Sequence, residues 1–380
     1  MPQRLSALRR RALLAGAAAS LASPFASAQP GRIAGRPLTV LQVVDTSPAQ
    51  QDVSKDFLIG SRAAWQAINA RGGLRGRKVE HRSLEVDGSP ASLRGVLATL
   101  RETPHCIALS GSAGDPVAAG LSRLLRDEDV AIAHAAPWLQ SSDVDAGDRT
   151  FPIFATRREQ IAHAVRSLAL VGVQSVGAVF ASAAGHRLYR DELERIAAEL
   201  GLRLLAYRAD GDLETVGTKL GPNAPAVLLF VGGTPELVQF THGMQRQRSH
   251  RYLVALADVN LQTVQQMAGA RTTGLPLIVT QPVPVVTAGL PVVRSYRDTL
   301  QRLFDEPPAA LSLAGYIAAR YTFEVLADVD GTPTRQSALA AFQRRATMDI
   351  GGFRVAFDER GRSTAYVTQS MLTQDGRVVG

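Results

Sequence analysis

The sequence predicts an α/β protein of two lobes, each built on a parallel sheet with helices on both faces. The chain has 380 residues, enough for two domains of ordinary size, and its hydrophobic content of 46% can fill a substantial core. Short apolar runs alternate with amphipathic stretches of helical length, which is the pattern of strand–helix–strand units. This alternation begins near residue 37 and restarts near residue 151, so it indicates two successive sheets.

The first block of alternation predicts four strands and three helices. Its strands are short and apolar, as parallel strands buried on both faces are, and are expected at 38–44, 78–86, 105–110 and 130–134. Its helices are expected at 54–70, 89–102 and 115–128. The second helix has Ser89 as its cap and Pro90 at its first position, and both residue types favour a helix start.

The second block repeats the pattern after an apolar segment at 151–156. Helices are expected at 158–172, 186–201 and 235–247, and strands at 175–181, 202–208, 225–232, 252–257 and 274–284. Two further helices are expected at 292–304 and 312–329. The tail at 351–372 predicts a hairpin, with the polar run "DERGRS" as its turn.

The first 28 residues have the three parts of a secretory signal peptide. Arg9–Arg11 supply the positive region, residues 12–22 a short apolar run, and Ala26–Ala28 a small-residue cleavage pattern before Gln29. The apolar run is about half the roughly 20 residues that a membrane-spanning helix needs. We therefore predict a periplasmic protein, exported by either the Sec or the Tat route. A cytosolic chain with a basic amphipathic start is the alternative.

Charge and cysteine content exclude several classes of protein. The formal charge is +8, and removal of the first 28 residues, which hold four arginines and no acid, lowers it to +4. The basic residues are scattered and do not interleave with aromatic residues, so nucleic-acid binding is not expected. The single cysteine, Cys106, excludes an intrachain disulfide and lies in an apolar run, which predicts a buried, inert thiol.

Catalytic and metal-binding motifs are missing from the sequence. None of the seven histidines forms an HxxxH pair or stands at metal-ligand spacing from the cysteine. The segment "SGSAG" (110–114) lacks the first glycine of a GxSxG elbow, and there is no phosphate-binding GxxxxGK[ST]. Asp45, Asp87, Asp115 and Asp258 stand near strand ends, where carboxylates cap helices more often than they catalyse. We predict a protein that is not an enzyme and that has no cofactor or metal.

A glycine-rich stretch, "QAINARGGLRGRKVE" (66–80), could suggest a phosphate loop. A phosphate loop follows a strand and opens a helix, so that backbone N–H groups point at the anion. Here the order is reversed, because the stretch ends a helix and begins a strand. Gly72, Gly73 and Gly76 are therefore predicted to shape a turn.

The same stretch is part of a resemblance to a known family. The segments 60–80, 110–137, 151–181, 279–284, 312–326 and 351–372 resemble, in order, the leucine/isoleucine/valine-binding type of type I periplasmic binding protein. The resemblance covers nearly all of residues 37–372. It implies two Rossmann-like lobes joined by three hinge crossovers, with a ligand that is buried between them when the lobes close. It also implies delivery of that ligand to the permease of an ABC importer.

The resemblance divides the chain into three parts. Residues 1–28 form the signal peptide, 36–153 plus 283–350 the first lobe, and 154–282 plus 351–380 the second lobe.

The first lobe is expected to supply two ligand loops. In "SGSAGDP", the Ser112 hydroxyl and the N–H groups of Ala113 and Gly114 are predicted to hold a carboxylate at the positive end of a helix. An ordinary helix start without a ligand is the alternative.

The second ligand loop lies in "AHAAPW". The resemblance implies contacts from Ala135 and Ala136, although the hydroxyl often found there is missing, which weakens the case for an α-amino acid. Trp138 is a candidate to stack on an apolar or aromatic ligand, or else packs beside the cleft.

The second lobe offers further candidates. The resemblance places Gly233 and Thr234 where relatives often carry an aromatic residue, and Asp258 near the ammonium-binding acid of amino-acid binders. Gly185 belongs to a loop that approaches the ligand in that family. Arg157, early in the helix after the first crossing, is a candidate partner for a carboxylate, with an exposed arginine as the alternative.

These features together predict a monomeric, extracytoplasmic solute-binding protein of an ABC importer. Its ligand is expected to be an amino acid or a small carboxylate, aromatic acids included. A sensing module of the same fold that serves a separate receptor or regulator is the alternative.

Overall fold

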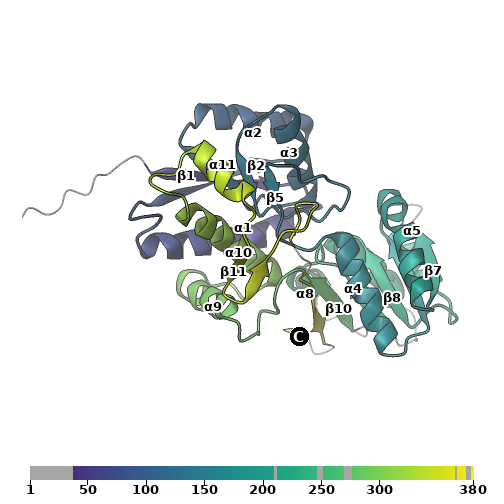
Figure 1. The fold of residues 1–380 in the computed structure, drawn as a ribbon. Helices are drawn as coiled ribbons and strands as arrows, with labels where there is room; N and C mark the ends of the chain where they lie inside the picture. The colour runs from purple at the N-terminus through teal and green to yellow at the C-terminus, as the bar shows by residue number, and fades with distance from the viewer. Residues whose placement is uncertain (1–36, 209–211, 246–250, 269–275, 364–365, 374–377) are drawn as a thin grey trace, which may run out of the picture. The chain divides into compact units, whose positions relative to one another are not determined.

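The computed structural model describes residues 37–208, 212–245, 251–268, 276–363, 366–373 and 378–380 (Figure 1). The predicted signal peptide and its cleavage site lie outside these residues. Within the described ranges, no helix has both the length and the apolar character needed to cross a membrane.

The first sheet has five strands in the order β2-β1-β3-β4-β5, and all its pairs are parallel. Its strands are β1 (Leu38–Asp45), β2 (Val79–Val86), β3 (Cys106–Ser110), β4 (Ala133–Ala135) and β5 (Thr150–Phe151). The helices that follow its first three strands are α1 (Gln51–Ala70), α2 (Pro90–Glu102) and α3 (Asp115–Asp127). Every residue of β1 is buried, which explains why its sequence is largely apolar and does not alternate.

The second sheet has seven strands in the order β14-β13-β10-β9-β8-β6-β7. Its parallel strands are β6 (Ser175–Phe180), β7 (Arg203–Arg208), β8 (Val227–Val231), β9 (Tyr252–Ala255) and β10 (Leu277–Gln281). Two antiparallel strands extend it, β13 (Thr368–Leu372) and β14 (Val378–Val379). Its helices are α4 (Arg157–Leu170), α5 (Ala183–Glu199), α6 (Leu213–Lys219), α7 (Thr234–Met244) and α8 (Leu261–Ala268).

Helices cover both faces of each sheet, as the sequence pattern predicts. Residues of α2 and α3 form one core with one face of the first sheet, whereas α1 packs on the other face with three later helices. These are α9 (Pro291–Leu303), α10 (Ala310–Ala327) and α11 (Arg335–Gln343). On the second sheet, α4 and α5 share one core and α6, α7 and α8 share the other. The predicted α/β fold of two lobes is confirmed.

The chain crosses between the two sheets three times, at 151–157, 281–291 and 355–368. The exact division of the chain into lobes stays a proposal. Its boundary at residue 350 is better moved past residue 355, because Phe353 and Val355 are buried in the core that contains α1 and α10.

The predicted hairpin at 351–372 is wrong. The hairpin that forms pairs β11 (Met348–Ile350) with β12 (Phe353–Val355), and β13 pairs with β10 of the second sheet. The expected turn at "DERGRS" does form, and the Asp358 N–H donates to the Arg362 carbonyl at 2.7 Å. Among the described residues, the chain on its two sides pairs only at a single bridge between Phe357 and Ser363. The local pattern does not indicate the partner of β13, because β10 lies nearly ninety residues earlier in the chain and β13 extends the second sheet beyond it.

The glycine-rich stretch is a turn, as predicted. Gly72, Gly73 and Gly76 all have positive φ angles, of 107°, 68° and 79°. The Gly73 N–H donates to the Ile68 carbonyl and closes the end of α1. A β-carbon at Gly73 would lie 2.0 Å from the Arg77 carbonyl oxygen, so the turn requires glycine there.

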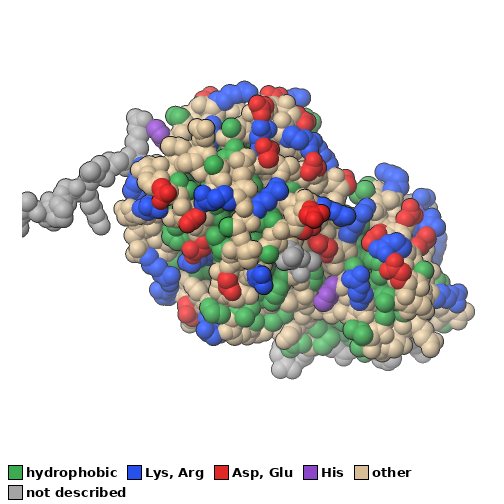
Figure 2. Space-filling view, viewed as in Figure 1, with side chains coloured by type: hydrophobic (Ala, Val, Ile, Leu, Met, Phe, Trp, Pro, Cys, Tyr) green, Lys and Arg blue, Asp and Glu red, His purple; other side chains and the backbone are tan. Residues whose placement is uncertain are grey.

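The outer surface carries mixed charge. On the face shown in Figure 2, basic and acidic side chains are interspersed and no continuous basic area stands out. This distribution agrees with the scatter of charge along the sequence.

Candidate functional site

A buried arginine joins the two lobes close to the first crossing. Arg157 is the first residue of α4, and its Nε donates to Asp258 Oδ2 at 2.8 Å. Its Nη2 donates to Asp115 Oδ2 at 3.2 Å and its Nη1 to the Tyr189 hydroxyl at 3.0 Å. Asp115 begins α3 of the first lobe, whereas Asp258 follows β9 of the second, so one guanidinium links both lobes.

The charges around Arg157 hold it in its ionised form. Burial alone would lower its pKa, but the carboxylates of Asp258 and Asp115 outweigh burial and hold the pKa well above its ordinary value. The side chain of Arg157 is only 15% exposed and those of Asp115 and Asp258 only 8% each. Removal of any one of the three would therefore leave a charge with too little water around it.

The two carboxylates differ in how fully they are hydrogen bonded. Asp115 also accepts the N–H groups of Gln140 and Ser141, at 2.7 and 2.8 Å, and the Ser141 hydroxyl. Asp258 has a buried Oδ1 that meets no donor among the described residues. Asp115 is thus held in place by several hydrogen bonds and supports Arg157. The Oδ1 atom of Asp258 has no donor among the described residues and can still accept a hydrogen bond.

The Ser112 hydroxyl forms a hydrogen bond with His134 inside the first lobe. Ser112 is fully buried, and its Oγ lies 2.9 Å from His134 Nε2. Burial lowers the pKa of His134 to about 3, so its ring is neutral at pH 7. The Ala113 N–H donates to the Val43 carbonyl at 2.8 Å. A ligand could use either predicted donor only by displacing these partners.

Gly114 is held close to the first strand. It has a φ angle of 95° and precedes α3, and a β-carbon there would lie 2.5 Å from Asp45 Cβ. The loop before α3 therefore requires glycine at this position. Its role in holding a ligand stays a prediction.

The second predicted loop lies under the interface between the lobes. Ala135 and Ala136 are fully buried, and the Ala136 N–H donates to the Phe151 carbonyl at 3.0 Å. Trp138 packs edge-on against Phe57, with ring centres 5.8 Å apart. Its indole Nε1 is buried and has no hydrogen-bond partner in the described part of the chain.

The second-lobe candidates divide into two groups. Thr234 Oγ1 donates to Asp52 Oδ2 of α1 at 2.6 Å and accepts the Asn260 N–H, so it contacts the other lobe directly. Gly233, just before it, caps α7. Gly185 instead lies in the first turn of α5, where its N–H donates to Ser182 Oγ, and only Tyr189 one turn later reaches Arg157.

Several residues of this interface were missed by sequence reasoning. Asp52 and Asp56, one turn apart on α1, accept hydrogen bonds from Thr234 and Asn260 of the second lobe. Burial raises the pKa of both carboxyl groups. Their spacing of four residues on a helix was the available signal, but it could not indicate which lobe they face.

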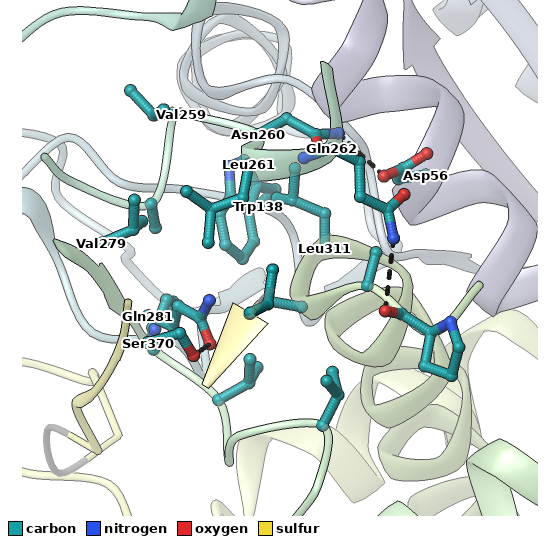
Figure 3. Close-up of a pocket in the computed structure, with 18 residues that line it drawn as sticks. Asp56, Trp138, Val259, Asn260, Leu261, Gln262, Val279, Gln281, Leu311 and Ser370 are labelled. Atoms are coloured by element: carbon teal, nitrogen blue, oxygen red, sulfur yellow. Dashed lines mark hydrogen bonds between the residues drawn. The ribbon is translucent and has the colours of Figure 1, made fainter. Parts of the chain in front are cut away.

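A small cavity lies beside these contacts, between the lobes (Figure 3). Its volume is about 60 Å³, and its lining is mainly apolar. Trp138 and Leu311 form first-lobe walls, and Val259, Leu261 and Val279 form second-lobe walls. Of the predicted ligand contacts, Trp138 alone lines it.

The described residues show no grouping suited to a resident metal. Within them, no three His, Cys, Asp or Glu side chains come close enough to hold an ion. Burial raises the pKa of the Cys106 thiol to about 11, so the predicted buried and unreactive cysteine is confirmed.

Comparison with protein families decides the classification. A family model described as "Periplasmic binding protein" matches residues 37–376. The chain belongs to the periplasmic binding protein family. The resemblance predicted from the sequence is thereby confirmed, and the family is one of binding proteins. No curated protein matches this periplasmic binding protein at a significant level.

Solved structures similar to this periplasmic binding protein share its fold at low sequence identity. An extracellular ligand-binding receptor from Verminephrobacter eiseniae has a TM-score of 0.79 at 17% identity, over 90% of this chain and 100% of its own. A possible leucine/isoleucine/valine-binding protein from Rhodopirellula baltica has a TM-score of 0.77 at 19% identity, over 92% and 97%. An ABC-transporter solute-binding protein from R. palustris, in complex with benzoate, has a TM-score of 0.71 at 12% identity, over 90% and 95%.

Proposed function

We propose that this protein is an extracytoplasmic solute-binding protein of an ABC importer. It binds an amino acid or a small carboxylate between its two lobes, and the lobes close around the ligand. In this proposal the protein acts as a periplasmic monomer and delivers its ligand to a permease in the inner membrane. The observation that carries the ligand assignment is the Arg157–Asp258 ion pair, which places opposite charges together on the second lobe at the point where Arg157 also pairs with Asp115 of the first lobe.

An α-amino acid is complementary to this ion pair. Its carboxylate can pair with Arg157 and its ammonium with Asp258, so insertion of the ligand replaces one internal ion pair with two. The free acceptor on Asp258 Oδ1 suits the ammonium, and Asp115 keeps hold of Arg157 throughout. Buried charges are tolerated only when they are paired, and this exchange leaves none unpaired.

Arg157 also stands at the right place to couple binding to lobe movement. It follows the first crossing directly, and closure about such a crossing is the usual motion of binding proteins of this kind. A ligand that pairs with both Arg157 and Asp258 binds to the second lobe, and it acts on the first lobe through the contact between Arg157 and Asp115.

The structural relatives support a range of acids and no single ligand. A Streptococcus pneumoniae branched-chain amino acid transporter protein is in complex with isoleucine, and the R. palustris protein is in complex with benzoate. An aromatic acid would pair with Arg157 but would leave Asp258 without a partner. We therefore rank amino acids ahead of simple carboxylates.

A thermal-shift screen of the mature protein tests this proposal. Amino acids, aromatic acids and small amides are added one at a time, and a ligand at about 100 times its Kd adds about 2.7 kcal/mol of stability. Titration calorimetry then measures each hit against Asp258→Asn and against Glu194→Gln, an exposed carboxylate used as the control.

We expect Asp258→Asn to weaken an amino-acid hit at least tenfold and Glu194→Gln to leave it unchanged. The proposal fails if no compound in the screen raises the melting temperature. It also fails if Asp258→Asn binds the hit as tightly as the wild type.

A further inference from the structure

Two carboxylates of the first lobe contact neutral groups of the second lobe. Asp52 and Asp56 lie one turn apart on α1. The Thr234 hydroxyl donates to Asp52 Oδ2 at 2.6 Å, and Asn260 Nδ2 donates to Asp56 Oδ2 at 2.8 Å. Within the part of the chain that the structure describes, neither carboxylate forms an ion pair. Both contacts join the lobes, so they stabilise the lobe arrangement of this structure.

The two donors of the second lobe are held in place by contacts of their own. Thr234 is the first residue of α7, and its Oγ1 accepts the Asn260 N–H at 2.9 Å. The Asn260 side chain caps α8, because its Oδ1 accepts the N–H groups of Gln262 and Thr263. Its Nδ2 is left to donate to Asp56. The second lobe thus presents a connected pair of neutral donors to α1.

The surroundings of the two carboxylates supply little positive charge. Besides their effect on each other, the groups that act on them are two acids, one base and one phenol: Asp258 after β9, Glu306 before α10, Lys55 on α1 and Tyr296 on α9. Lys55 is exposed, so water screens its charge. Burial raises the pKa of both Asp52 and Asp56, because water is withdrawn and no paired cation replaces it.

Opening of the lobes would return both carboxylates to water. Movement of the second lobe away from α1 removes Thr234 and Asn260, and the pKa of each carboxyl group then falls toward its ordinary value of 3.8. The closed arrangement therefore binds protons more tightly than the open one, and a fall in pH favours closure. This effect is complete below pH 3.8 and is lost as the pH rises through the raised pKa values.

We propose that Asp52 and Asp56 form a proton-operated latch between the lobes, in which each carboxylate takes up a proton from water as the lobes close and releases it as they open. The latch rests on the lobe movement of the proposed function and not on the identity of the ligand.

The hydrogen bonds of the latch accommodate both protons. Asp56 Oδ1 accepts no hydrogen bond from the described residues, so it can carry a proton while Oδ2 keeps its contact with Asn260. A protonated Asp52 Oδ2 can donate to Thr234 Oγ1. The Thr234 hydroxyl hydrogen then turns to the Asp258 carbonyl oxygen, which lies 3.5 Å from Thr234 Oγ1.

Distance measurements by electron paramagnetic resonance on the mature protein without ligand test the latch. Ala98→Cys on α2 and Gln239→Cys on α7 place one nitroxide label on each lobe at an exposed position, and Cys106 is buried and stays unlabelled. We expect the closed population to rise at least about threefold from pH 7 to pH 5, with circular dichroism to show that the protein is folded at both. Equal populations at the two pH values would overturn the proposal.

A double variant identifies the groups that take up the protons. Asp52→Asn with Asp56→Asn imitates the protonated latch, because each amide keeps an acceptor for its partner. At pH 7 its closed population should reach at least that of the wild type at pH 5, and it should not change with pH. Asp191→Asn with Glu194→Gln, exposed on α5, is the control and should respond to pH as the wild type does. A wild-type response in the Asp52 and Asp56 double variant would refute the latch, because another group would then carry the proton.

The latch and the proposed function fail separately. A hit from the thermal-shift screen should close the labelled protein at pH 7. If such a hit closes the lobes and a change of pH alone does not move them, the latch is wrong and the proposed function stands. If pH shifts the populations and no compound of the screen binds, the latch stands and the ligand assignment is wrong.

Discussion

Two regions of the interface between the lobes differ in how they are filled. At Arg157, the chain occupies the interface with its own charges, and each lobe contributes one carboxylate to the same guanidinium. Beside Trp138, apolar walls from the same two lobes enclose a space that side chains do not fill. The first region depends on oriented ion pairs, and a competing charge can displace one of their partners. The second has mainly apolar walls, so its occupant must match it in size.

The largest expected effect comes from breaking the charged region with Arg157→Ala. This change leaves the carboxylates of Asp115 and Asp258 buried without a cation. We expect the free energy of unfolding in urea to fall by about 3–5 kcal/mol. Arg190→Ala, which removes an exposed helix ion pair with Glu194, serves as the control and should cost less than about 0.5 kcal/mol.

Addition of Asp258→Asn to Arg157→Ala should recover part of the loss, because it removes one of the two stranded charges. A loss below about 1 kcal/mol in the single variant would show that water reaches the site, contrary to its burial.

Acid should weaken the first lobe at His134, whose ring lies against the Ser112 hydroxyl. The pKa of His134 is about 3 in the folded protein, whereas the ordinary pKa of histidine, expected in the unfolded chain, is 6.5. As pH falls, the unfolded chain therefore binds the extra proton first. The stability from His134 is complete above pH 6.5 and declines below it. Between pH 7 and pH 5 this single group should cost about 2 kcal/mol.

His134→Gln removes the titration while its amide can still donate to the Ser112 hydroxyl. We expect the fall in unfolding free energy from pH 7 to pH 5 to be shallower in this variant by about 2 kcal/mol. His242→Gln, on the exposed side of α7, should keep the wild-type slope. Equal slopes for His134→Gln and the wild type would show that His134 is not buried in the neutral form.

Filling the cavity should remove the difference between the two regions, because side chains would then occupy both. Ala310→Leu adds three carbons from the first turn of α10, at the edge of the cavity. We expect a gain of about 1 kcal/mol in unfolding free energy, in line with the usual cost of an unfilled space of this size. Ala340→Leu, exposed on α11, is the matched control and should change stability little. A loss of stability in Ala310→Leu would mean that the cavity is too rigid to accept the side chain.

The smallest expected effect concerns the carboxylate at the edge of the cavity. Burial raises the folded-state pKa of Asp56, so ionisation penalises the folded protein at pH 7. Asp56→Asn should therefore raise the unfolding free energy by a few tenths of a kcal/mol at pH 7. The gain should vanish as pH falls and Asp56 takes up its proton. A gain that persists at low pH would have a different origin.

The sequence predicts much of the fold because buried parallel strands and amphipathic helices are local patterns. It predicts less of the site, since contacts depend on residues far apart in the chain. Arg157 and Asp258 were each candidates, but their pairing spans 101 residues. Asp115 was interpreted as a helix cap, and it does begin α3, yet its carboxylate serves Gln140, Ser141 and Arg157.

Two further features were beyond sequence reasoning for physical reasons. The availability of the Ser112 hydroxyl depends on His134, which reaches it only because β3 and β4 are neighbours in the first sheet. The cavity is a mismatch between two packed surfaces, and no residue type marks the place where side chains fail to meet. Local patterns indicate which faces are buried but not how well two faces fit.

The contact between α1 and α10 also sets limits on sequence change. A β-carbon at Gly60 would lie 1.7 Å from the Ser312 carbonyl oxygen, and one at Gly315 would lie 1.9 Å from the Phe57 carbonyl oxygen. The two helices thus touch backbone to backbone, and they carry Asp56 and Leu311 of the cavity wall. Any side chain at either glycine would push these walls apart. In a mutational scan for ligand binding, substitutions at Gly60 and Gly315 would reduce binding as substitutions of ligand contacts do, although neither glycine lines the cavity.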